Sequence, residues 1–231
     1  MTSVVLIGYG AIAKLVLEGL AADDESAIVA GILVRPNKLD AARAALPKTI
    51  AVITSPQEIT PIRPDLVVEC AGQGAVGDYG AAVLAAGYDF MLVSTGALVD
   101  DELRSDLIET AQRNGVRLLV PAGATAGLDG LAALRAGGLR GVRYTSTKPA
   151  RAWKGTPAET EFDLDGLTEA TVIFTGSARE AARRYPKNAN IAATIALAGL
   201  GLDETQVRLV ADPAATDNAQ RIEAEGKFGT L

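Results

Sequence analysis

The sequence predicts an α/β protein in which a doubly wound parallel sheet is followed by a smaller α+β domain. In the first half, short apolar runs alternate with helical patterns. These runs are continuous and rich in β-branched residues, as is typical of strands covered on both faces. After about Pro121, strand-like runs carry polar residues at alternate positions, which favours half-exposed antiparallel strands. We therefore expect a first domain at residues 1–123 and a second at 124–231.

Six strands are expected in the first domain, interleaved with four helices. The expected strands are 3–8, 28–34, 50–53, 65–70, 90–94 and 116–120. The expected helices are 10–21, 39–46, 76–86 and 100–114. This alternation predicts a parallel sheet with helices on both faces.

The second domain is expected to be a sheet packed on helices, serving the substrate and oligomerisation. Its expected strands are 141–148, 170–175, 206–211 and 220–226, and its expected helices are 179–185 and 190–200. Residues 229–231 follow a strand-like run without a closing element, so we expect a further C-terminal segment in the protein.

Composition excludes several classes of protein. Hydrophobic residues make up 48% of the 231 residues, which is enough for a sizeable core, and the net charge of -6 disfavours nucleic-acid or anionic-membrane partners. Cys70 is the single cysteine, so no intrachain disulfide forms and a reducing compartment fits. No signal-peptide pattern or segment of transmembrane length is present, so we expect a cytoplasmic protein, and we assign no metal site.

A glycine fingerprint, Gly8-x-Gly10-x-x-Ala13, lies between the first expected strand and helix. Gly8 permits a tight turn, Gly10 lets the backbone approach a pyrophosphate, and Ala13 allows close packing of helix on strand. The backbone N–H groups of Ala11 and Ile12 then face the phosphates at the helix N-terminus. A purely structural glycine turn is the alternative. The position between strand and helix favours a Rossmann domain that binds a dinucleotide.

The end of the second strand bears on the choice between NAD and NADP. It continues into Arg35-Pro36-Asn37-Lys38, without the carboxylate that usually binds the ribose hydroxyls. Arg35 is suited to stacking on adenine or pairing with a 2′-phosphate. We therefore expect NADP to be accepted along with NAD, the alternative being that Arg35 is a solvated loop residue.

Several linked motifs follow one another along the chain. They are 68–72 (VECAG), 94–98 (STGAL), 121–124 (PAGA), Lys148-Pro149 with Trp153, Gly155-Thr156-Pro157, 176–181 (GSAREA), 185–194 (YPKNANIAAT), Asp212-Pro213 and Asn218. In this order they resemble the L-aspartate dehydrogenases, relatives in fold of dihydrodipicolinate reductase and homoserine dehydrogenase. The resemblance runs over essentially the whole chain.

This resemblance implies an enzyme and two of the expected cofactor contacts. The implied reaction is the reversible, nicotinamide-dependent conversion of L-aspartate to iminoaspartate, which hydrolyses to oxaloacetate and ammonia and can feed NAD synthesis. It also implies a homodimer, and contacts from Ala124 and Asn190 to the cofactor. Asn190 opens an expected helix, so an N-cap role is its alternative.

The ends of the later strands supply the remaining expected cofactor contacts. In open α/β sheets, ligands bind outside the carboxyl ends of the strands. Cys70, Ala71 and Gly72 end the fourth strand, Ser94 the fifth, and Ala122 follows the sixth. We expect these small residues to let the cofactor approach, and Cys70 to be buried.

A dicarboxylate substrate needs cations or N–H donors. Lys148 is the first candidate and Lys187 the second, although a solvated surface lysine is the alternative for each. Trp153 is expected to pack in the core. Asp212 is expected in a turn or cap, with no catalytic role.

The chain contains no histidine, whereas the family carries one close to its C-terminus, two residues after an asparagine. Gln220 stands at that position, two residues after Asn218. Glutamine forms hydrogen bonds but does not exchange a proton at useful pH, so we expect weakened catalysis. Three explanations stay open: an engineered substitution, a natural variant using another base such as Lys148, and a protein that binds without turnover. The wider alternatives are a related reductase acting on another small acid and a non-catalytic dinucleotide-binding regulator.

Overall fold

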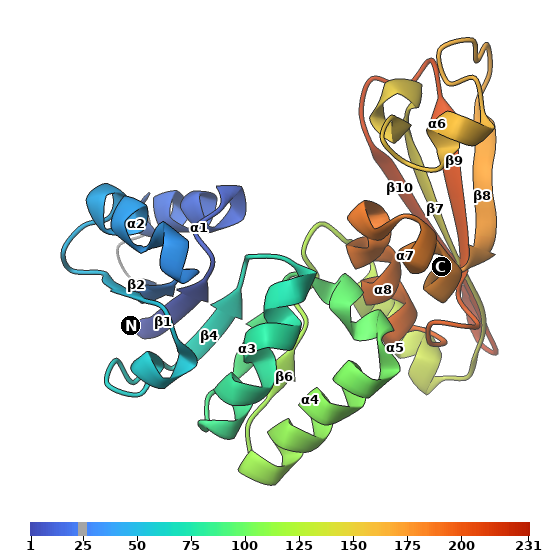
Figure 1. Cartoon of the computed structure of the whole chain (residues 1–231). Coiled ribbons are helices and arrows are strands. Elements are labelled where there is room, and N and C mark those ends of the chain that lie inside the picture. Colours follow the sequence, from blue (N-terminus) through green and yellow to red (C-terminus); the bar gives the residue numbers. More distant parts are fainter. Residues whose placement is uncertain (23–26) are drawn as a thin grey trace. The chain divides into compact units, whose positions relative to one another are not determined.

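The computed structural model describes residues 1–22 and 27–231. The chain separates into two compact units, Met1–Pro121 and Ala122–Leu231, which are described in turn (Figure 1). Among the described residues, no helix is long and apolar enough to cross a membrane.

The first unit is built on a six-stranded sheet in the order β3-β2-β1-β4-β5-β6. Every neighbouring pair in it runs parallel. The strands are β1 (Thr2–Ile7), β2 (Ala27–Leu33), β3 (Ala51–Ile53), β4 (Leu66–Glu69), β5 (Phe90–Leu92) and β6 (Leu118–Leu119). The helices are α1 (Ala11–Ala22), α2 (Leu39–Ala45), α3 (Gln73–Ala85) and α4 (Asp101–Asn114). The expected doubly wound parallel sheet is confirmed.

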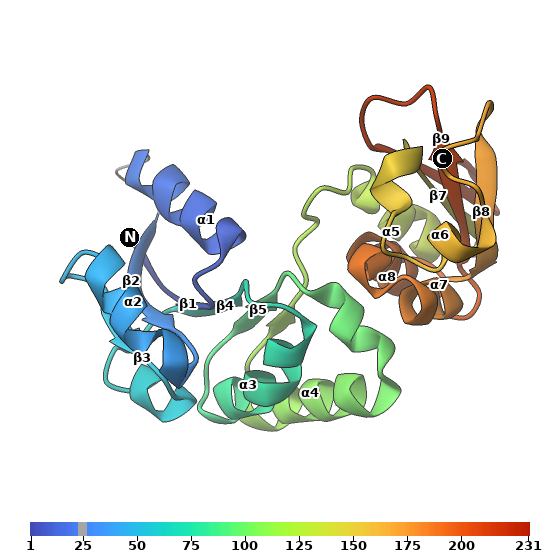
Figure 2. The same cartoon turned by 45° about the horizontal axis from the view of Figure 1, so that its top comes forward.

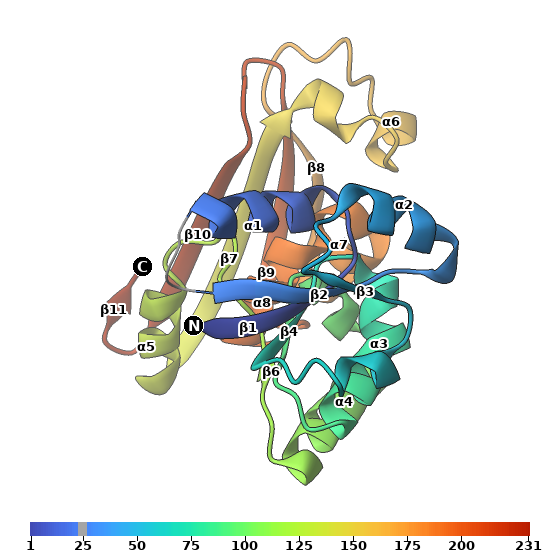
Figure 3. The same ribbon diagram turned by 90° about the vertical axis from the view of Figure 1, so that its left-hand side faces the viewer.

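Helices cover both faces of this sheet, α1 and α2 on one and α3 and α4 on the other (Figure 3). The central strand β1 is therefore apolar throughout its buried part, and Val5 and Leu6 are fully buried. Ala13 of α1 is fully buried in the same core as Leu6 and Ile32. The chain order reverses at β1, between β2 and β4, which is the switch point where such sheets bind ligands.

The second unit contains a five-stranded sheet in the order β11-β10-β7-β9-β8. Its strands are β7 (Leu139–Pro149), β8 (Thr171–Ser177), β9 (Gln206–Asp212), β10 (Ala219–Gly226) and β11 (Gly229–Thr230). Its helices are α5 (Leu128–Ala136), α6 (Ala158–Glu161), α7 (Ala178–Arg184) and α8 (Ala189–Ala198), of which α5, α7 and α8 pack against the sheet (Figure 2). Short 3-10 helices occur in both units, at η1 (Pro36–Lys38), η2 (Pro56–Ile59), η3 (Thr95–Val99), η4 (Ala150–Trp153) and η5 (Pro186–Asn188).

Three expectations for the second unit are wrong. The sheet is mixed, because β7 and β9 pair in parallel across the long connection that carries β8, α7 and α8. Residues 229–230 were expected to form no closing element but form β11, which pairs with β10, and Leu231 exchanges two backbone hydrogen bonds with Ala224; the further C-terminal segment stays a prediction. Helix α8 begins at Ala189, so its N-cap is Asn188 and not Asn190.

Burial in β7 alternates as expected for a sheet with one covered face. Val142, Tyr144 and Ser146 are buried, while Arg143 between them is exposed. Trp153 is fully buried, and its indole Nε1 donates a hydrogen bond to the carbonyl oxygen of Val210 at 3.1 Å. The packing role expected for Trp153 is thus confirmed.

Candidate active site

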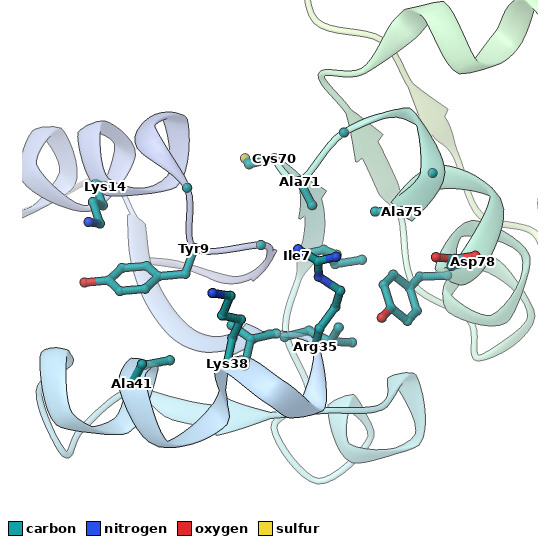
Figure 4. Close-up of a pocket in the computed structure, with 18 of the residues that line it drawn as sticks. Ile7, Tyr9, Lys14, Arg35, Lys38, Ala41, Cys70, Ala71, Ala75 and Asp78 are labelled. Atoms are coloured by element: carbon teal, nitrogen blue, oxygen red, sulfur yellow. The ribbon is translucent and has the colours of Figure 1, made fainter.

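A cavity of about 690 Å³ opens in the first unit at the carboxyl ends of β1, β2 and β4 (Figure 4). Its lining comes from the β1–α1 turn, the end of β2 with η1 and α2, and the β4–α3 junction. The lining residues are Ile7, Gly8, Tyr9, Gly10, Lys14, Leu33, Val34, Arg35, Lys38, Ala41, Ala42, Ala45, Cys70, Ala71, Gly72, Gln73, Gly74, Ala75, Asp78 and Tyr79. The cavity therefore lies at the switch point of the sheet.

Gly8 makes the tight turn that the fingerprint predicts. Its φ is +99°, in the region that favours glycine, and its N–H donates to the Leu33 carbonyl at 2.8 Å. A Cβ at this position would lie 2.7 Å from the Cβ of Ala71. Gly8 is thus required by protein packing, because the β1–α1 turn lies directly against the end of β4.

Gly10 differs from Gly8 because its missing Cβ faces open space. A Cβ at Gly10, Gly72 or Gly74 would meet no heavy atom within 4 Å, although all three residues line the cavity. These positions leave backbone accessible to a ligand. The first N–H groups of α1, at Ala11 and Ile12, lack carbonyl partners within the helix and are available to an anion. The surroundings thus fit a pyrophosphate.

The cavity wall near β2 is cationic. Arg35 follows β2 and Lys38 ends η1, and both side chains extend into the cavity (Figure 4). Lys14 of α1 lies with its Nζ 5.3 Å from the centre of the Tyr9 ring. Asp78 of α3 is the one acidic residue among the described lining residues.

Glu69, the last residue of β4, is a site residue that the sequence did not single out. It is fully buried, and its carboxylate accepts hydrogen bonds from the backbone N–H groups of Ala71, Gly72 and Ser94. A carboxylate at the end of an otherwise apolar strand is the sequence signal that could have revealed it. Burial, with the nearby Glu69 charge, raises the pKa of the Cys70 thiol to about 11, and Cys70 is buried as expected.

Ser94 lies beside this carboxylate. Its hydroxyl donates to Glu69 Oε1 at 3.0 Å, and the residue is buried. The described lining of the cavity does not include Ser94, Ala11 or Ile12, whereas Gly8, Gly10, Arg35, Cys70, Ala71 and Gly72 all belong to it.

In the second unit, Lys148 is half-buried close to the end of β7. Its Nζ donates to Oδ1 of Asn188 and lies 5.2 Å from the centre of the Trp153 ring. Burial lowers the pKa of the Lys148 ammonium group below its usual value. The alternative of a solvated surface lysine therefore does not describe Lys148. The side chain of Lys187 lies outside the described part of the chain.

Gln220 faces Ser146 across the β7–β10 ladder. Because side chains alternate along a strand, Tyr144, Ser146 and Lys148 share one face of β7, and Gln220 lies on the same face of the sheet. The Tyr144 hydroxyl donates a hydrogen bond to Gln220 Oε1, and burial raises the pKa of Tyr144. Gln220 itself is exposed. The face thus combines a cation with a hydroxyl–amide pair.

The other expected contacts of this unit lie at its start and on α8. Ala122 opens a turn in which the Thr125 N–H donates to the Ala122 carbonyl at 3.0 Å, and Ala124 within this turn is exposed. Asn190 is an exposed residue in the first turn of α8. Asp212 accepts a hydrogen bond from the Ala214 N–H at 2.8 Å, which is the expected turn role.

Comparison with known proteins gives matches over both units. Residues 8–121 match the model of the homoserine dehydrogenase NAD binding domain, and residues 129–231 match the C-terminal aspartate dehydrogenase model. The chain is 48% identical to the L-aspartate dehydrogenase of Cupriavidus necator and 47% identical to that of Pseudomonas aeruginosa, in both cases over 99% of this chain and 86% of the relative. The crystal structure of aspartate dehydrogenase from Thermotoga maritima matches with a TM-score of 0.75 and 26% identity, over 100% of this chain and 87% of that one. The chain therefore belongs to the L-aspartate dehydrogenase family.

Proposed function

We propose that the protein is an NAD(P)-dependent L-aspartate dehydrogenase. It oxidatively deaminates L-aspartate to iminoaspartate, which hydrolyses to oxaloacetate and ammonia, and it catalyses the reverse reductive amination. The observation that carries the proposal is the switch-point cavity, which joins glycine backbone open to a ligand with three cationic side chains, in a chain 48% identical to an L-aspartate dehydrogenase.

The dinucleotide would be held by backbone more than by side chains. The N–H groups of Ala11 and Ile12 at the start of α1 suit the pyrophosphate, with Gly8 and Gly10 shaping the turn. The nicotinamide supplies hydride transfer when it is bound, so the protein has to orient it and exclude competing reactions. We assign this orienting task to Cys70, Ala71, Gly72, Ser94, Ala122, Ala124 and Asn190.

We infer that NADP is accepted as well as NAD. Arg35 and Lys38 both point into the cavity, at the place where NAD-specific sites carry a carboxylate for the ribose hydroxyls. A 2′-phosphate beside Arg35 would form charge-assisted hydrogen bonds, for which a guanidinium group is well suited. Lys38 adds a second positive charge at the same end of the cavity.

Lys148 is proposed to bind a carboxylate of the substrate. Its ammonium group is half-buried, and the neighbours that the structure gives it are the neutral Asn188 amide and the Trp153 ring. A partly desolvated cation gains more from an anionic ligand than a solvated one does. The lowered pKa also increases the neutral fraction of Lys148, so Lys148 is the candidate base if one is needed.

Gln220 is proposed to limit turnover. The Tyr144 hydroxyl donates a hydrogen bond to Gln220 Oε1, and an amide has no proton to exchange near neutral pH. Gln220 therefore supports binding and orientation, while proton transfer is slower than with an imidazole. The homodimer and the supply of iminoaspartate to NAD synthesis are proposed from the family alone, and the cytoplasmic location from the sequence pattern.

Product analysis tests this proposal. The protein is incubated with NADH, oxaloacetate and ¹⁵N-labelled ammonium, and nuclear magnetic resonance is used to look for ¹⁵N-labelled L-aspartate. Labelled aspartate supports the proposal. Dinucleotide binding without any amino acid product favours a regulator that binds and does not turn over, a candidate that Gln220 specifically supports.

A further inference from the structure

The buried carboxylate of Glu69 has no role in the function proposed above. Glu69 ends β4, between Ile7 of β1 and Leu92 of β5, and is 0% exposed. A buried carboxylate is costly unless hydrogen bonds or opposite charges compensate it. Here backbone and hydroxyl donors compensate it, and these donors belong to the junctions that follow β4 and β5.

The two carboxylate oxygens divide these donors unequally. Oε1 accepts from the Ala71 N–H at 2.7 Å, the Gly72 N–H at 2.6 Å and the Ser94 hydroxyl at 3.0 Å. Oε2 accepts from the Ser94 N–H at 3.0 Å. One side chain therefore ties the end of β4 to the end of β5.

The backbone fixed in this way forms part of the cavity wall. Ala71 and Gly72 line the cavity, and Gly72 has a φ of +128° that other residues rarely adopt. Ala71 also lies against the fingerprint turn, because a Cβ on Gly8 would lie 2.9 Å from the Ala71 Cα. Glu69 thus holds a junction of unusual backbone conformation on the β4 side of the switch point, opposite the cations at the end of β2.

A doubly wound sheet binds the two halves of a dinucleotide on the two sides of its switch point. The β2 side, with Arg35 and Lys38, suits the adenosine half, which leaves the β4 side for the nicotinamide half. We propose that Glu69 is a positioning residue that holds the Ala71–Gly72 backbone in the shape needed by the nicotinamide ring of the cofactor. This rests on the proposed function, because it requires the protein to bind NAD(P).

Glu69→Gln is the sharpest substitution, because it keeps size and shape. An amide has one acceptor oxygen and one donor NH₂ group. If the NH₂ group takes the place of Oε2, it faces the Ser94 N–H. If it takes the place of Oε1, it faces the three donors that bond that oxygen. The substitution therefore releases the junction without emptying space.

The experiment compares two ligands by calorimetry on the full chain. NADH carries both halves of the cofactor, whereas ADP-ribose lacks only the nicotinamide. The hydrogen bonds lost lie within the protein, so the worth of one charge-assisted bond, about 10- to 150-fold, is an upper bound on the loss of NADH affinity, and we expect Glu69→Gln to weaken NADH binding about tenfold. ADP-ribose affinity should stay within about twofold. A general loss of structure would weaken both ligands together.

Two further variants make the comparison decisive. Glu58→Gln is the matched control, because Glu58 also accepts from a backbone N–H and nearby hydroxyls, at Thr54 and Ser55, but is not among the described lining residues of the cavity. It should change neither affinity. Ser94→Ala removes one hydroxyl donor and should weaken NADH selectively by about 2- to 10-fold. If Glu69→Gln does not fold, Ser94→Ala alone tests whether loss of this junction weakens NADH binding selectively.

Equal losses for NADH and ADP-ribose, or no change in either, in a folded Glu69→Gln or Ser94→Ala variant would overturn the inference. In that case the wild-type chain still binds NADH and the proposed function stands. A wild-type chain that binds neither ligand overturns the proposed function and this inference together.

Discussion

Gly8 and Gly10 are two residues apart, yet they are glycines for different physical reasons. Gly10→Val should abolish NAD(P)H binding while the thermal unfolding temperature stays close to that of the wild type, because the new side chain enters open cavity space. Gly8→Ala should instead lower the unfolding temperature, because its Cβ meets Ala71 at 2.7 Å and the φ is unfavourable. Calorimetry and thermal melts on both variants check this. Undiminished affinity in folded Gly10→Val would contradict the assigned site.

Arg35 decides how the cavity treats a 2′-phosphate. Arg35→Ala should weaken NADPH binding by about 10- to 150-fold, the value of a charge-assisted pair, and NADH binding much less. Dissociation constants for both cofactors measure the difference. Equal losses would indicate that Arg35 stacks on adenine instead.

Lys148 gives a pH dependence with a definite sign. Burial lowers its pKa, and only the protonated form attracts a carboxylate, so anion binding is lost as pH rises through that lowered value. A dicarboxylate without an amino group, such as succinate, should therefore inhibit less well at alkaline pH. Lys148→Arg should remove the dependence, because a guanidinium group stays charged. The same pH profile in both proteins would show that another group is responsible.

Among the elements, α4 shows how local sequence sets a boundary. Asp100 caps it by accepting hydrogen bonds from the N–H groups of Glu102 and Leu103, and Gly115 ends it with a φ of +66°. Asp100→Ala should lower the free energy of unfolding by about 1 kcal/mol, the usual value of an N-cap. Denaturant unfolding measures this, and since α4 contributes no described residue to the cavity, cofactor affinity should not change. A larger effect on affinity than on stability would contradict this account.

The elements of the first unit could be predicted because strand, turn and helix each have a local signature there. The apolar run of β1 and the fingerprint Gly8–Ala13 are adjacent in the sequence, and in the structure they form the strand, turn and helix start that the pattern predicts. The parallel β7–β9 pair could not be predicted, since the alternating pattern of each strand indicates neither its partner nor the direction of pairing. Helix α5 was missed because its apolar residues follow a glycine-rich stretch with weak helical spacing.

The candidate site could be predicted only in part, for a similar reason. Residues that act through backbone near a fingerprint, such as Gly10 and Gly72, are visible in sequence. Glu69 was not, because its partner Ser94 is distant in sequence and meets it only once β4 and β5 are paired. The hydrogen bond from Tyr144 to Gln220 likewise depends on the register of β7 with β10, which no local pattern encodes.

We propose that the whole molecule is an L-aspartate dehydrogenase in which one proton-transfer step is slow. The dinucleotide site of the first unit is complete in its turn, its open glycines and its cations. In the second unit Lys148 is proposed to bind the substrate, and Gln220 is proposed to stand where the family carries a group that titrates near neutral pH. We therefore expect this chain to bind cofactor and substrate but to turn over slowly.

The most direct measurement follows NADPH and NADH oxidation with oxaloacetate and ammonium, for the wild type and for Gln220→His, with oxaloacetate alone as the control. We expect slow, ammonium-dependent oxidation by the wild type and a kcat higher by up to about 10²–10⁴-fold in the variant, the usual worth of general acid–base catalysis. The gain should depend on pH between about 6 and 8, where imidazole titrates, with cofactor affinity hardly changed. Cofactor binding without ammonium-dependent oxidation in either protein would contradict the account.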